Sequence, residues 1–120
     1  MSRLPDALLQ HLREPRHVGE APGGETHRGE ARNAACRDLL VFSLRVADGR
    51  VAAAGFKAHG CPATLGMASA ATELLPGLAW DKQVAAAARV RFVEAYGEPA
   101  VMHRHALSLV TEALAAAHGG

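Results

Sequence analysis

The sequence predicts an α+β fold in which a small sheet follows one helix and precedes several others. Two extended, largely apolar runs flank the dipeptide Asp48-Gly49, a pattern typical of a β-hairpin. Apolar residues at helical spacing occur before this hairpin, over 5–12, and again after Cys61. Strands and helices are therefore segregated along the chain, and this order favours an α+β architecture over a parallel α/β one.

Length and composition narrow the class of protein. A chain of 120 residues, 49% of them hydrophobic and 21% charged, suffices for a single domain over 1–120 with its own core. The net charge of +1 gives no electrostatic reason to expect a nucleic-acid partner. No apolar run reaches about 18 residues, and residues 1–15 alternate polar and apolar types, so we expect no membrane span, no signal peptide and a cytoplasmic location.

The first helix is expected over 5–12, where Pro5 suits the first turn and Pro15 ends the helical pattern. The following stretch is rich in Gly, Pro, Glu, His and Arg. Its clearest turn lies at 21–24, and a short strand is expected around 26–31.

The Asp48-Gly49 loop predicts the register of the hairpin. If the residues on either side of this turn pair, these residues lie opposite one another: Phe42 and Gly55, Asp38 and His59, Cys36 and Cys61. Directly opposed residues have Cβ atoms about 5 Å apart, so the turn alone would bring the two thiols together. A bulge in so long a ladder would shift this pairing by one residue.

Several helical stretches are expected after the hairpin. One begins at Pro62 and runs to about Leu75, with small residues that permit close packing on a sheet. Asp81 is expected to cap the next, through the alanines at 85–88, followed by a shorter stretch over 90–96. The last helix is expected from about His105 to Ala117.

Three kinds of donor side chain, Cys, Asp and His, mark a candidate metal site. Cys61 immediately precedes a predicted helix, whose free N–H groups and dipole favour a thiolate. Cys36 stands two residues before Asp38, and His103 and His105 stand at the start of the last helix. Two sulfurs, one imidazole nitrogen and one carboxylate oxygen form a donor set that suits zinc or the iron atoms of a small cluster.

The same residues have simpler interpretations. A cysteine in such a chain can be a small buried hydrophobe, and a stable disulfide is disfavoured in a reducing compartment. Cys61 can also be a nucleophile with His105 as its base, and Asp38 can be a turn residue that bonds the backbone. The remaining histidines, His11 among them, are expected to be solvated side chains.

Three segments in order carry a resemblance to a known family. Residues 11–19 read HLREPRHVG, 34–38 read AACRD and 56–61 read FKAHGC. These resemble the segments His-x-x-Asn-Pro-Arg-Asn-x-Gly, Ala-x-Cys-Gly-Asp and Phe-Lys-x-x-Gly-Cys of the NifU/IscU-like iron-sulfur cluster assembly scaffold family. The resemblance covers most of the chain.

The resemblance implies a fold and a function. The fold would be a three-stranded antiparallel sheet packed on helices, with the ligands at one end. Members of the family are non-enzymatic scaffolds that hold a nascent [2Fe-2S] cluster, or zinc in its absence, with three cysteines and a nearby Asp or His. They receive sulfur from a cysteine desulfurase and pass the finished cluster to apo-proteins.

The chain departs from the family pattern at the third ligand segment. Where the family reads like Pro-Pro-Val-Lys-Ile-His-Cys, residues 99–105 read PAVMHRH, so His105 stands at the position of the third cysteine. An imidazole in place of a thiolate makes the site less negative, as in Rieske centres. The chaperone-recognition segment Leu-Pro-Pro-Val-Lys is reduced to EPAVM at 98–102, so dependence on an Hsp70-type chaperone is not expected.

The expected protein is therefore a scaffold that binds a [2Fe-2S] cluster, iron or zinc through Cys36, Cys61 and His105, with Asp38 or His103 completing the set. It is expected to be a monomer or a weak homo-oligomer. Two other functions stay open at this point: a divergent zinc-binding structural or regulatory module without assembly activity, and a Cys/His enzyme.

Overall fold

The computed structural model describes residues 5–33 and 37–119, and its order of elements confirms the predicted α+β class. One helix precedes three strands, which are followed by three α-helices and a short 3₁₀ helix. The elements are α1 (Asp6–Arg13), β1 (His27–Asn33), β2 (Asp38–Ala47), β3 (Arg50–His59), α2 (Pro62–Leu74), α3 (Val84–Tyr96), η1 (Val101–His103) and α4 (Arg104–Gly119).

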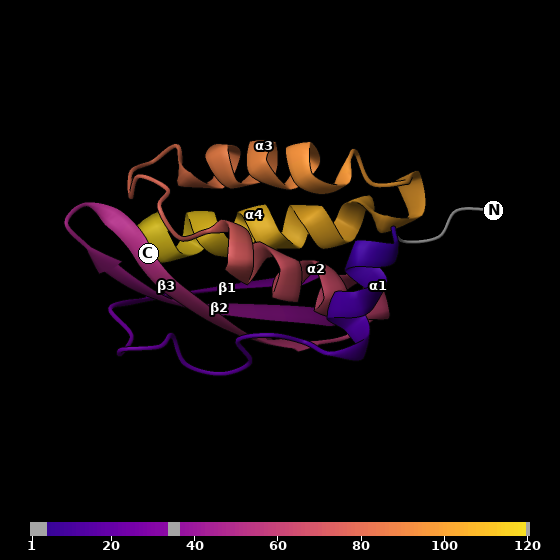
Figure 1. The fold of residues 1–120 in the computed structure, drawn as a ribbon, viewed down its shortest axis with the longest axis horizontal. Helices are drawn as coiled ribbons and strands as arrows, with labels where there is room; N and C mark the ends of the chain where they lie inside the picture. The colour runs from indigo at the N-terminus through magenta and orange to yellow at the C-terminus, as the bar shows by residue number, and fades with distance from the viewer. Residues whose placement is uncertain (1–4, 34–36, 120) are drawn as a thin grey trace.

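The helices form layers on one side of the sheet. The strands lie in the order β1-β2-β3 and are antiparallel, as predicted. Helices α2 and α4 cover one face of the sheet, and α3 packs on α4 on the side away from the strands (Figure 1). Helix α1 packs against α2. The starts of α2 and α4 therefore lie at one end of the molecule, opposite the β2–β3 turn (Figure 1).

The hairpin contains a bulge that changes the predicted register. The pair next to the turn, Ala47 and Arg50, is as predicted, but the pairing shifts by one between Arg45 and Val46. Ala52 is the extra residue in β3. Every pair beyond this point differs from the prediction by one position.

This shift has a packing reason. Phe42 pairs with Phe56, where Gly55 was predicted. His59 pairs with Leu39, where Asp38 was predicted. The predicted facing of Cys36 and Cys61 lies outside the described residues. Because successive side chains alternate between faces, the bulge turns Phe56 to the same face as Phe42, and both rings are fully buried.

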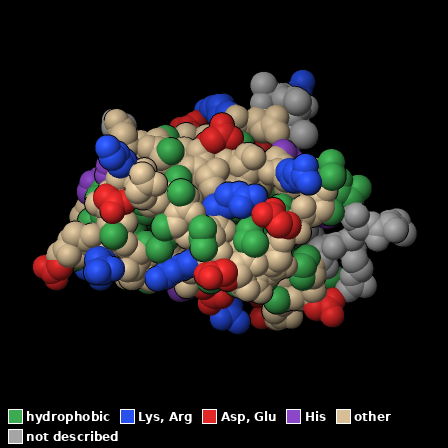
Figure 2. All heavy atoms as spheres, turned by 90° about the horizontal axis from the view of Figure 1, so that it is seen from above, with side chains coloured by type: hydrophobic (Ala, Val, Ile, Leu, Met, Phe, Trp, Pro, Cys, Tyr) green, Lys and Arg blue, Asp and Glu red, His purple; other side chains and the backbone are tan. Residues whose placement is uncertain are grey.

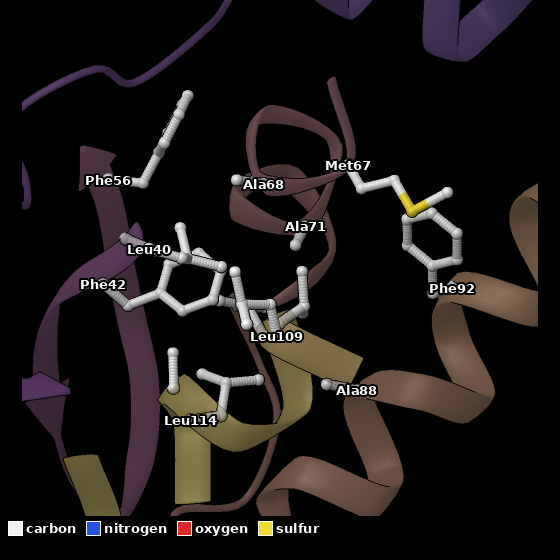
Figure 3. Packing of buried hydrophobic residues seen from close by; sticks show 14 of the residues in the cluster. Leu40, Phe42, Phe56, Met67, Ala68, Ala71, Ala88, Phe92, Leu109 and Leu114 are labelled. Carbon is white, nitrogen blue, oxygen red and sulfur yellow. The ribbon is translucent and has the colours of Figure 1, made fainter. Parts of the chain in front are cut away.

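The core lies between the sheet and α2 and α4. Phe42 from the sheet, Ala71 from α2 and Leu109 from α4 point into the same space, and Met67 lies beside the ring of Phe92 from α3 (Figure 3). Small residues on α2 let its backbone come close to the strands. This packing holds the starts of α2 and α4 in fixed positions relative to β2.

Gly29 on β1 allows α4 to pack directly on the strand backbone. A Cβ atom at this position would overlap the carbonyl oxygen of Ala113 and lie 2.5 Å from the amide nitrogen of Ala117. Both are backbone atoms of a helix, which cannot move aside as a flexible side chain does.

Gly29→Ala is expected to lower the free energy of unfolding by about 2–3 kcal/mol, because α4 must move off the sheet to make room. Urea unfolding followed by circular dichroism measures this change. Gly119→Ala, at the end of the same helix with nothing within 4 Å of the added atom, is the matched control. Equal stability of the two variants would contradict the close contact.

The prediction that His11 is solvated is wrong. Its ring is buried between α1 and α2, with Nδ1 2.7 Å from the Ser69 hydroxyl and Nε2 3.1 Å from a Glu73 oxygen. The amide of Arg16 donates to the same hydroxyl at 2.8 Å. A neutral ring with its proton on Nε2 satisfies this series of hydrogen bonds, because Ser69 then donates to Nδ1. The network fastens the segment after α1 to α2.

The stability of the fold is expected to fall as the pH drops below about 6.5. The pKa of His11 lies below its ordinary value of 6.5, because burial disfavours the charged ring. The adjacent Glu73 acts in the opposite direction but does not cancel this effect. The unfolded chain therefore binds a proton in a range where the folded chain does not, and acid favours unfolding there. Urea unfolding at pH 7.5 and 5.5 should show this loss, and His11→Gln should reduce it. The exposed His59→Gln is the control, and an unchanged pH dependence in His11→Gln would contradict the assignment.

Helix α3 also begins later than predicted. Asp81 is not its N-cap: the carboxylate accepts from the amide of Gln83 at 2.8 Å in a preceding turn, and the helix starts at Val84. From there one continuous helix covers both stretches that were predicted separately.

The end of the molecule at the β2–β3 turn carries an aromatic contact group. The ring of Trp80 lies 4.9 Å from that of His27 on β1 and 5.3 Å from that of His118 on α4. The Trp80 amide donates to the carbonyl of Gly49 in the turn. This group joins the hairpin, the edge strand and the last helix.

The face over α3 carries charged groups of both signs, with hydrophobic side chains between them in small areas (Figure 2). None of the helices within 5–33 and 37–119 is long and apolar enough to cross a membrane.

Candidate metal centre

Three predicted site residues meet where α2 and α4 begin. Asp38 is the first residue of β2, Cys61 joins β3 to α2, and His105 is in the first turn of α4. One donor atom from each lies within 4.8 Å of the other two. The Cys61 sulfur is 3.0 Å from His105 Nε2, and Asp38 Oδ2 is 3.4 Å from both. The structure thus brings together residues that are up to 67 positions apart, from Asp38 to His105 (105 − 38).

The local sequence explains the position of Cys61. It is the N-cap residue of α2, in an extended conformation, and Pro62 begins the helix. Its sulfur does not cap the helix, so it is left to face His105. The thiol is half-buried and the imidazole is 25% exposed, so the site is partly open to solvent.

Asp38 is fixed by hydrogen bonds at both carboxylate oxygens. Oδ1 accepts from the amide of Cys61 at 2.9 Å, and Oδ2 accepts from the hydroxyl of Thr64 at 2.9 Å. The residue is 1% exposed. Gly60 makes this arrangement possible, because a Cβ at its position would overlap Oδ1 and its φ is +135°.

These contacts keep the carboxyl group ionised. Burial alone would raise the pKa of Asp38, but hydrogen bonds from the Cys61 amide, the Thr64 hydroxyl and the Cys61 thiol outweigh it. The nearby imidazole acts in the same direction, and the pKa lies below its ordinary value. Asp38 is therefore an anionic oxygen donor at neutral pH.

Of the other two candidates, the structure describes only His103. Cys36 lies outside the described residues, two positions before Asp38 in the sequence. His103 is in η1, and its ring is not among the donor atoms that lie within 4.8 Å of one another in the described part of the chain. Of the two predicted fourth ligands, the geometry thus favours Asp38.

Sequence reasoning missed two residues of the site, Thr64 and Gly60. Thr64 follows Cys61 by three positions, so both face the same side of the first turn of α2, and this spacing was the available signal. Gly60 stands inside a family-like segment, but its contact with Asp38 depends on the register of the bulged hairpin.

Comparison with known proteins shows the family of this chain. The family described as the NifU-like N-terminal domain matches residues 4–118. The chain belongs to the NifU-like N-terminal domain family. The family match confirms the resemblance read from the three segments.

Two relatives and one solved structure of this family illustrate the similarity. The bifunctional protein NifU/MnmA of Rubrobacter xylanophilus is 44% identical over 71 residues, which are 58% of this chain and 14% of that protein. The iron-sulfur cluster assembly scaffold protein IscU 1 of Archaeoglobus fulgidus is 29% identical over 109 residues, 91% of this chain and 70% of that one.

The crystal structure of a nitrogen-fixing NifU-like protein (N-terminal) from Brucella abortus has the same fold. Its TM-score is 0.69 at 15% identity, over 94% of this chain and 90% of that chain. The NifU-like chain described above therefore shares its sheet and helices with a solved member of the family.

Proposed function

We propose that this chain is a non-enzymatic iron-sulfur cluster assembly scaffold, a single domain over 1–120 that holds a nascent [2Fe-2S] cluster, or iron, as cargo. Its ligands are Cys61, His105 and Asp38 together with Cys36. The observation that carries the proposal is the approach of three different donor atoms to within 4.8 Å at one partly open end of the fold.

The chemistry of the donors supports transient binding. Thiolate and imidazole both suit iron and zinc, whereas a carboxylate oxygen is a harder and weaker donor to such a soft centre. Asp38 is therefore the ligand that exchanges most readily when cargo is released. With His105 in the third cysteine's place, the loaded site carries one negative charge fewer than a site with three thiolates and one Asp.

Partners follow from the same proposal. Sulfur comes from a cysteine desulfurase and the cluster passes to apo-protein acceptors. An imidazole cannot carry a sulfane sulfur, so transferred sulfur is taken by Cys36 or Cys61. No dependence on an Hsp70-type chaperone is proposed, because residues 98–102 read EPAVM. The proposed location is the cytoplasm.

A zinc-binding module is the second candidate, because two sulfurs, one nitrogen and one oxygen also match a four-coordinate zinc site. Anaerobic incubation with iron, sulfide and a cysteine desulfurase, followed by visible absorption and metal analysis, separates the two. Visible charge-transfer bands with bound iron and sulfide would support the scaffold. A colourless protein that retains only zinc would support the module.

The contact between Cys61 and His105 also permits a nucleophilic cysteine. Labelling of Cys61 by an electrophile distinguishes this role from metal ligation. Bound metal should protect a ligand thiolate, and a chelator should restore its labelling. Labelling that is the same with and without chelator would favour the enzyme.

A further inference from the structure

We propose that Thr64 is a positioning residue that sets how readily the site releases its metal, through the hydrogen bond from its hydroxyl to Asp38. This inference rests on the proposed function, because it concerns the exchangeable ligand of the same site. Thr64 is 0% exposed, in the first turn of α2, and Oγ1 lies 2.9 Å from Asp38 Oδ2 and 3.4 Å from the Cys61 sulfur.

The two carboxylate oxygens of Asp38 have different partners. Oδ1 accepts from the amide of Cys61. Oδ2 faces the other two donors, 3.4 Å from both the Cys61 sulfur and His105 Nε2, so it is the oxygen placed to bind a metal. Thr64 donates to this same oxygen, and the hydroxyl thus competes with the metal for its electron density.

The competition has a definite sign. A metal ion bound to Oδ2 withdraws electron density and weakens the hydrogen bond from Thr64, whereas the free carboxylate accepts it at full strength. An interaction changes an affinity only by the difference between its strengths in the two states. The hydroxyl therefore stabilises the empty site more than the loaded one and favours release.

Among the described residues, the hydroxyl has one other contact, 3.4 Å from the Cys61 sulfur. The amide of Thr64 donates to the Cys61 carbonyl at 3.1 Å, a bond that any non-proline residue supplies. The N-cap of α2 is Cys61, and no side chain caps this helix. Removal of the hydroxyl therefore leaves the helix start in place, and an Asp38→Ala background separates the bond to Asp38 from the contact with Cys61.

The test uses Co²⁺ as a coloured probe, followed by its thiolate charge-transfer absorption while a chelator removes it. Thr64→Val, which keeps the shape and lacks the hydroxyl, is expected to release Co²⁺ about tenfold more slowly, the order expected when metal binding weakens but does not abolish a hydrogen bond to a charged group. Thr64→Ala should also slow release, and Thr64→Ser, which keeps the hydroxyl, should match the unsubstituted chain. Equal or faster release from both Val and Ala variants would overturn the proposal.

A second pair of variants separates positioning from packing. In an Asp38→Ala background the hydroxyl has no carboxylate to hold, so adding Thr64→Val should leave the release rate unchanged. The same slowing in both backgrounds would overturn the proposal. Absence of Co²⁺ uptake by the unsubstituted chain would contradict the proposed function itself, whereas uptake with equal release rates contradicts only the role of Thr64.

Discussion

Replacement of His105 by Ala is expected to lower the affinity of the chain for Co²⁺ by about 100-fold or more. Loss of a group that merely orients a ligand costs about 10–100-fold, and His105 supplies a ligand atom itself. Its Nε2 lies 3.0 Å from the Cys61 sulfur, and a water molecule in its place would be a weaker donor than the imidazole. Titration followed by Co²⁺ absorption measures the change.

His103→Ala provides the matched control. This histidine precedes His105 by two positions and is also partly exposed, but its ring is not in the donor group of the described residues. The control should bind Co²⁺ as the unsubstituted chain does. A loss in His103→Ala together with normal binding in His105→Ala would reverse the assignment of the imidazole ligand.

Gly60→Ala is expected to impair both stability and metal binding. The added Cβ would overlap Asp38 Oδ1 and lie 2.7 Å from the carboxylate carbon, so the carboxylate must leave its place. It then loses the bond from the Cys61 amide while its surroundings still exclude water. We expect the free energy of unfolding to fall by about 3 kcal/mol or more, since a buried charge loses a hydrogen bond.

Backbone strain contributes to this effect and needs its own control. Gly97 also has a positive φ, +83°, and a Cβ there meets nothing within 4 Å. Gly97→Ala should therefore lose about 1 kcal/mol from strain alone and bind Co²⁺ normally. If Gly60→Ala were no less stable than Gly97→Ala and retained its Co²⁺ affinity, the contact between Gly60 and Asp38 would have no role.

Local signals were sufficient for the main elements. Asp48-Gly49 predicted the hairpin because a two-residue turn needs positive φ, and both residues adopt it, at +54° and +73°. Pro62 predicted the start of α2 because its ring suits the first turn. The close approach of Cys61 and His105 was predicted from the order of the family-like segments. The match to the family explains why that order was informative.

Features that depend on tertiary contacts were not predicted. Ala52 has no property that marks a bulge, and the bulge is favoured because it turns Phe56 into the core. The burial of His11 requires Ser69 and Glu73 on another helix, more than 50 positions away. Such contacts arise only when the whole fold is assembled, so no short window of sequence contains them.

The contact group around Trp80 gives the protein a built-in optical reporter. It is the chain's single tryptophan, and it sits beside the turn that begins about 30 Å along β2 from Asp38, at ~3.3 Å per residue. Its emission will follow the separation of the hairpin from the last helix, at the end of the molecule opposite the candidate metal centre. Fluorescence of the metal-free chain can thus time unfolding, and visible absorption of the loaded chain can time the loss of its metal.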